Sequence, residues 1–141
     1  YLWLYQKMLF GKAASYNAVD AINKTDVPVL IIHGTEDNTV LYDGSSIISK
    51  IDDINNPNVK TIAISEEKKN GHNSMFRSEA ALDYIDEINA SYRELYDKYD
   101  QNIPYEIKQD FYLNIDRDLV QELNISLMDE INSFFLECLN K

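Results

Sequence analysis

The sequence predicts an α/β protein in which about two parallel strands combine with several packed helices. The run "VLII" from Val29 to Ile32 is continuously apolar and mostly β-branched, which is typical of a parallel strand covered on both faces. The stretch "VKTIAI" from Val59 to Ile64 alternates well enough to form a second strand. A helical pattern lies between them, and this order favours a parallel pair joined by a crossover.

The segment between the two strands has the features of a helix. Asp43 is a suitable N-cap, and "NNP" at residues 55–57 is a stop signal. Four isoleucines fall on one face at helical spacing: Ile47, Ile48, Ile51 and Ile54. Upstream, "SYNAVDAINKTD" also predicts a helix, whereas residues 1–10 fit either a short helix or a cap segment.

Beyond the second strand, the polar loop "SEEKKNGHNS" is followed by helical patterns. One apolar stripe has spacings of three and four and consists of Ala81, Ile85, Ile88, Tyr92, Leu95 and Tyr99. Pro104 interrupts it, "DRDLVQEL" fits a short helix, and residues 124–139 predict a last one. We therefore expect residues 1–141 to form a single partial domain. Residues 27–78 would be its βαβ core, and residues 79–141 a helical extension with the final helix.

Composition excludes several classes of function. The formal net charge of −11 argues against a nucleic-acid or anionic-membrane surface, because both select clustered Lys and Arg. The single cysteine, Cys138, has no internal disulfide partner, so we expect a reducing, cytoplasmic location. No apolar run approaches the roughly 20 residues that span a bilayer. Metal-ligand spacings and glycine-rich phosphate loops are absent from the sequence, and we expect no metal or cofactor.

Two polar loops follow the two predicted strands. The first reads "HGTEDN" and carries Asp37, and the second carries Gly71 and His72. Parallel strands bring such loops to one edge of the sheet, where open α/β sheets place their chemistry. A carboxylate can fix the tautomer of an imidazole, which then takes a proton from a serine hydroxyl.

Other roles for these residues remain open at this point. Asp37 fits an Asx turn, Glu36 is a rival acid, and His72 fits a surface loop. Gly71 suits a backbone of positive φ. His33, at the end of the first strand, is expected to be a buried structural histidine with a satisfied ring rather than a base.

A strand ending in "HGTED", a helix, a second strand and a loop containing "GH" resemble the C-terminal portion of the α/β-hydrolase fold. The resemblance covers residues 20–78 and the last helix, and it implies that Asp37 is the triad acid and His72 the triad histidine. The family's G-x-S-x-G motif is missing, since "YDGSSI" lacks the second glycine and follows the acid. The resemblance thus implies the acid and histidine part of a serine hydrolase, inactive alone, whose nucleophile lies upstream.

We expect the parent to be an esterase, lipase, thioesterase or peptidase-like enzyme that acts on a small-molecule ester or amide. The chain enters its pattern midway at Tyr1, so we expect a piece of a longer protein. An exposed sheet edge would favour a homo-oligomer, such as a dimer. The alternative is a non-catalytic hydrolase-like domain or an acidic helical interaction module.

Overall fold

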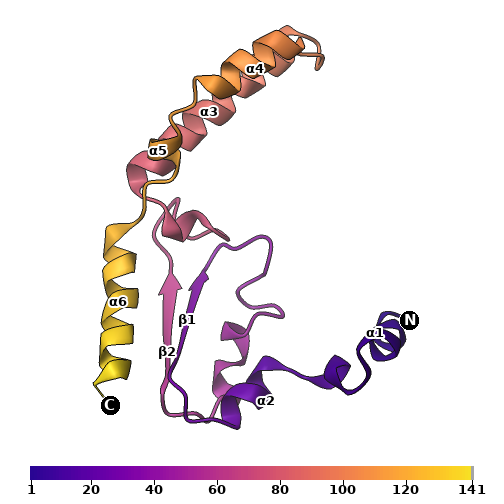
Figure 1. The fold of residues 1–141 in the computed structure, drawn as a ribbon, viewed down its shortest axis with the longest axis vertical. Helices are drawn as coiled ribbons and strands as arrows, with labels where there is room; N and C mark the ends of the chain where they lie inside the picture. The colour runs from indigo at the N-terminus through magenta and orange to yellow at the C-terminus, as the bar shows by residue number, and fades with distance from the viewer. Residues whose placement is uncertain (141) are drawn as a thin grey trace.

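The computed structural model describes residues 1–140, and its centre is a two-stranded parallel sheet (Figure 1). Strand β1 (Val29–Gly34) pairs with β2 (Val59–Ile64), with Val29 opposite Val59 and Gly34 opposite Ile64. Both predicted strands and their parallel pairing are confirmed, and β1 extends two residues beyond the apolar run. The mixed α/β class is therefore correct.

The other regular elements of the described chain are helical. The chain contains α1 (Leu2–Phe10), η1 (Gly11–Ser15), α2 (Ala18–Asn23), η2 (Ile48–Asp53), η3 (Ser74–Phe76), α3 (Glu79–Lys98), α4 (Tyr105–Leu113), α5 (Arg117–Val120) and α6 (Ile125–Leu139). Helix α6 runs along one side of the sheet, and α2 and η2 lie on the other (Figure 1). The small core consists of Ile31, Ile48, Met75, Ala81, Leu127 and Phe134.

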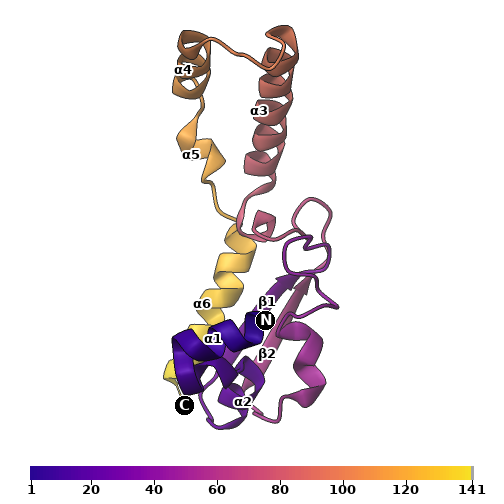
Figure 2. The ribbon, with the colours of Figure 1, turned by 90° about the vertical axis from the view of Figure 1, so that its right-hand side faces the viewer.

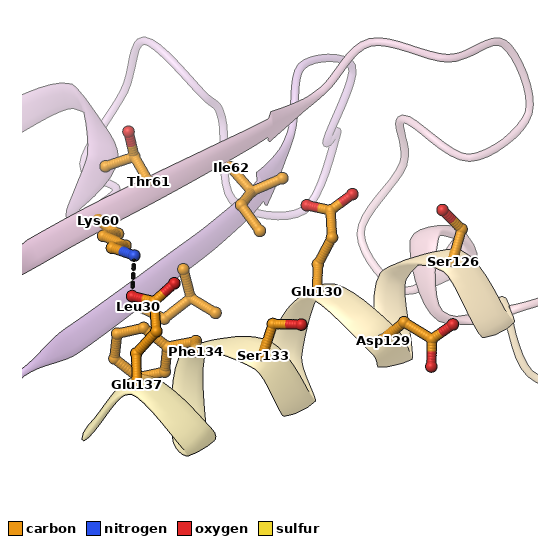
Figure 3. A pocket seen from close by; sticks show the side chains of 10 residues that line it. All are labelled: Leu30, Lys60, Thr61, Ile62, Ser126, Asp129, Glu130, Ser133, Phe134 and Glu137. Atoms are coloured by element: carbon orange, nitrogen blue, oxygen red, sulfur yellow. Dashed lines mark hydrogen bonds and ion pairs between the residues drawn. The ribbon is translucent and has the colours of Figure 1, made fainter. Parts of the chain in front are cut away.

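Helix α6 covers the sheet only in part. Figure 3 shows Phe134 near Leu30, and Lys60 paired with Glu137 at the edge of the contact. A groove of about 450 Å³ remains between helix and strands. The predicted packing of several helices is correct only for some of them, since α1, α2, α4 and α5 contain no buried residue. Two strands offer too little apolar surface to cover them all.

The crossover between the strands differs from the prediction. It is a 3₁₀ helix that begins after Ile47, and Asp43 lies in a preceding turn rather than at an N-cap. Ser46 Oγ donates to the Tyr42 carbonyl at 2.7 Å, and Ser49 Oγ lies 2.8 Å from the Gly44 carbonyl. Such local side-chain bonds compete with the α-helical pattern and favour a tighter turn. Ile48 is nevertheless buried, as its place in the stripe predicts.

Residues 79–121 form a helical arm that extends away from the sheet (Figures 1 and 2). Ser78 caps α3, because its Oγ accepts the Ala81 amide at 3.0 Å. The two ends of the arm lie side by side, since the Ser78 amide donates to the Glu122 carbonyl at 3.0 Å. Between residues 82 and 121 no apolar side chain is buried. The arm thus leaves and rejoins the sheet region at adjacent residues and has no core of its own.

Helix α1 at the other end of the chain is also poorly covered. Most of its apolar side chains are exposed, Trp3 at 64% and Met8 at 79% among them. Across residues 1–140, no helix combines the length and the apolar character that crossing a membrane requires.

Candidate functional site

The carboxylate of Asp37 is held in a tight turn directly after β1. The Asp37 amide donates to the Gly34 carbonyl at 3.3 Å, which closes the turn. Asp37 Oδ1 accepts hydrogen bonds from the amides of Thr39 at 2.8 Å and Val40 at 2.9 Å. Asp37 therefore makes the Asx turn that its sequence suggested, and this turn fixes the direction of the carboxyl group. The residue is only 4% exposed.

The loop after β1 lies directly against the loop after β2. The Thr35 amide donates to the Ile64 carbonyl, and the Glu36 amide donates to the Asn70 carbonyl, both at 2.9 Å. A Cβ atom on Gly34 would lie 2.3 Å from the Asn70 oxygen. Glycine is therefore required at position 34 for the close approach of the two loops. The side chain of Glu36, the rival acid, is exposed.

The two predicted site residues are in contact. His72 Nδ1 lies 2.7 Å from Asp37 Oδ2, so the predicted juxtaposition of carboxylate and imidazole is present. An ionised carboxylate can only accept a hydrogen bond, so we assign the proton of the neutral ring to Nδ1. The lone pair of Nε2 is then free. Within residues 1–140 Nε2 has no hydrogen-bond partner, and 44% of the His72 side chain is exposed.

The conformation of Gly71 differs from the prediction. Among residues 1–140 the glycine with positive φ is Gly11, not Gly71. Space constrains Gly71 instead, because a Cβ atom there would lie 3.1 Å from Ser74 Oγ. The Gly71 amide donates to that same Oγ at 3.0 Å, which orders the backbone next to His72.

The electrostatics of the pair favour an ionised acid. Burial raises the pKa of Asp37, but the hydrogen bond from His72 and those from the Val40 and Thr39 amides outweigh it. Together they lower the pKa of the carboxyl group from 3.8 to about 2. Asp37 is thus a carboxylate at neutral pH, and it stabilises a positive charge on His72 whenever the imidazole gains a proton.

His33 contacts the same carboxylate from the side of β1. Its Nε2 lies 2.9 Å from the Val40 carbonyl and 3.4 Å from Asp37 Oδ2. Its ring meets Tyr42 edge to face, with centroids 5.7 Å apart. His33 is half-buried rather than buried, and its ring contacts the turn through Nε2, as expected of a structural histidine. That it does not act as a base stays a prediction. Its second contact, with the Asp37 carboxylate, was missed, although the i,i+4 spacing after a strand that ends at Gly34 was a possible signal.

A cavity of about 210 Å³ adjoins the pair, with Met75 and Phe76 contributing to its apolar wall. Ser46 also lines it, but its Oγ donates to the Tyr42 carbonyl and accepts the Ser49 amide, so it serves the turn. The larger groove beside α6 does not include Asp37 or His72. We place the candidate site at the smaller cavity because His72, bonded to the Asp37 carboxylate, lines it. The volume of a cavity by itself identifies no chemistry.

Comparison of the chain with protein-family models, with curated proteins and with solved structures finds no match. Among the described residues, no group of three or more His, Cys, Asp and Glu side chains is placed to hold a metal ion. The feature of this chain that points to a function is the geometry of Asp37 and His72.

Proposed function

We propose that Asp37 and His72 are the acid and base of a serine-hydrolase triad of the α/β-hydrolase type. The serine would come from polypeptide outside these 141 residues, and the substrate would be an ester, thioester or amide. One observation carries the proposal, the 2.7 Å bond between a buried carboxylate and an imidazole with its second nitrogen free. His72 differs from His33 in this respect, because the Nε2 of His33 lies 2.9 Å from the Val40 carbonyl.

Each residue would have a definite role in acyl transfer. His72 Nε2 takes the proton of the serine hydroxyl as the oxygen attacks the substrate carbonyl carbon, and later delivers it to the leaving group. Asp37 holds the Nδ1–H tautomer and stabilises the imidazolium that forms. Its pKa of about 2 keeps the carboxylate ionised over the pH range in which histidine works.

The nearby serines do not fit the role of nucleophile. Ser74 Oγ is used by the Gly71 amide, and Ser46 is only 4% exposed and bonded to the turn. These two bonds support a nucleophile that lies outside these 141 residues. We therefore expect the 141-residue chain to be inactive by itself.

The test uses the complete gene product and a fluorophosphonate probe, which labels activated serines. We expect labelling of the wild type and turnover lowered about 10⁴-fold in Asp37→Asn, as in comparable triads. His72→Ala should lose labelling as well. Glu36→Gln is the matched control, because it neutralises the exposed neighbouring acid and should retain activity. A wild type without adduct, or an Asp37→Asn variant with normal ester hydrolysis, contradicts the proposal.

A further inference from the structure

The helical arm contains a groove that the proposed chemistry does not use. The groove has a volume of about 380 Å³ and lies between α3 and α4. Its apolar walls include Ile88 and Leu95 from α3 and Ile107 and Phe111 from α4. Two carboxylates belong to its lining, Glu87 on α3 and Asp110 on α4. Figure 2 shows the two helices side by side and joined at the far end of the arm.

Contact between the two helices is partly aromatic. The rings of Tyr92 and Phe111 lie 5.3 Å apart, and those of Tyr92 and Tyr112 lie 5.9 Å apart. Nearer the sheet, the Tyr84 hydroxyl accepts the Asp116 amide at 3.0 Å, which ties the base of the arm together. The groove is therefore bounded by fixed contacts at the aromatic cluster and at the base.

The apolar residues of this groove are only half covered. Ile88, Leu95 and Phe111 are of intermediate exposure, and Ile107 is 37% exposed. Most helical stability in proteins comes from packing an apolar face against another element, and two helices with an open seam leave this packing incomplete. A third amphipathic helix would complete it.

The negative charge of the arm favours a partner helix that is basic. Residues 79–121 contain eleven acidic and four basic side chains, which gives the arm a net charge of −7 out of −11 for the chain. A second copy of the arm would bring another −7 to the same seam, and this repulsion opposes self-association. A helix rich in Lys and Arg would instead meet complementary potential.

We propose that the groove between α3 and α4 binds a basic amphipathic helix of a partner protein. The apolar side chains of that helix sit between Ile88 and Ile107, and its cationic side chains pair with Glu87 and Asp110. This binding is independent of the Asp37–His72 chemistry.

The probe is a fluorescent peptide of about 18 Leu and Lys residues, patterned to place all Leu on one helical face. The same peptide with Glu in place of Lys is its control. The full 141-residue chain should bind the Lys peptide with an affinity that falls as salt rises, and should not bind the Glu peptide. Equal binding of both peptides, or binding of neither, overturns the proposal.

Two matched pairs of substitutions locate the binding. Glu87→Gln with Asp110→Asn removes two charges from the groove, and should weaken Lys-peptide binding about tenfold. Asp86→Asn with Asp97→Asn removes two charges from the opposite side of α3, and should change binding by less than about twofold. Circular dichroism checks that both proteins keep their helices. Equal weakening by the two pairs would show a general charge effect and refute the groove.

The apolar walls are tested with Ile88→Ser, which should also weaken binding. Sedimentation of the wild type without peptide tests whether a second copy of the chain occupies the groove. A monomer supports a free groove, whereas a dimer that Ile88→Ser abolishes would assign the groove to a second copy and overturn the proposal.

Discussion

The sheet with its two loops and the helical arm are held together by different kinds of contact. In the sheet region, segments far apart in the sequence bond to one another, as Asp37 does to His72 and Glu36 to Asn70. In the arm, the bonds are mostly within helices and at their caps, and no side chain between residues 82 and 121 supplies an apolar core. Contacts of the first kind hold Asp37 and His72 in one geometry, whereas contacts of the second kind leave an open groove between α3 and α4.

The end of the sheet away from the site is fixed in the same long-range way. Asn56 is only 8% exposed, and its Nδ2 donates to the carbonyls of Thr25 at 2.8 Å and Val27 at 3.1 Å. The Asn55 amide donates to Asn23 Oδ1 at 2.7 Å. The sequence suggested only that these asparagines stop a helix. In the structure they connect the crossover to the segment that enters β1.

The largest expected effect is that of Gly34→Ala. The added Cβ would meet the backbone oxygens of Asn70 and Gly71 at 2.3 and 2.5 Å, and a backbone atom cannot move aside as a flexible side chain can. We expect the two loops to separate, the His72–Asp37 bond to be lost, and stability to fall by about 1–3 kcal/mol or more. NMR of the His72 Nδ1–H proton and thermal unfolding measure both.

Gly71→Ala is the control for that substitution. Its Cβ would meet only the side chain of Ser74, with Oγ at 3.1 Å, and a side chain can shift where a backbone oxygen cannot. If Gly71→Ala were as damaging as Gly34→Ala, the steric account of the loop contact would be wrong.

The second-largest expected effect is on the stability of the chain at acidic pH. The pKa of Asp37 is lowered in the folded chain to about 2, so the ionised carboxylate contributes stability that is fully present above pH 3.8 and is lost as the pH falls toward 2. Asn at this position lacks that contribution. We expect the difference in unfolding free energy between wild type and Asp37→Asn to shrink as the pH falls from 3.8 to 2. Urea unfolding across this range measures it, and a difference independent of pH would contradict the assignment.

A smaller effect is expected from the cap of the arm. Ser78→Ala removes the acceptor for the Ala81 amide and should cost about 1 kcal/mol of stability, with less helix by circular dichroism. The His72 Nδ1–H resonance should not move. Ser91→Ala, within α3, is the control and should be neutral or slightly stabilising, since alanine is the better helix former. A displaced His72 signal in Ser78→Ala would show that arm and site are coupled.

The smallest effect on the site is expected from removing most of the arm. Replacing residues 85–115 with a short Gly/Ser linker keeps Tyr84 and Asp116, which are already bonded at 3.0 Å. Because the arm begins and ends at adjacent residues, the His72–Asp37 bond should survive, again by NMR. Loss of that bond would mean that the arm supports the sheet region.

Sequence alone determined the elements whose signals are local. The continuous run in β1, the alternation in β2 and the stripe of α3 depend on neighbours within a few residues, so their patterns were readable. The pairing of Asp37 with His72 was also predicted, because parallel strands deliver their following loops to one edge. Its catalytic role remains a prediction.

Only the tertiary structure decided the rest. The 3₁₀ form of the crossover depends on serine bonds to a preceding turn, and the need for glycine at position 34 depends on a loop that lies about 36 residues later. His33 acquires its place beside Asp37 from the fold of a turn that strand patterns do not encode. Contacts between distant segments have no period in the sequence, and in this chain they set the geometry of the site.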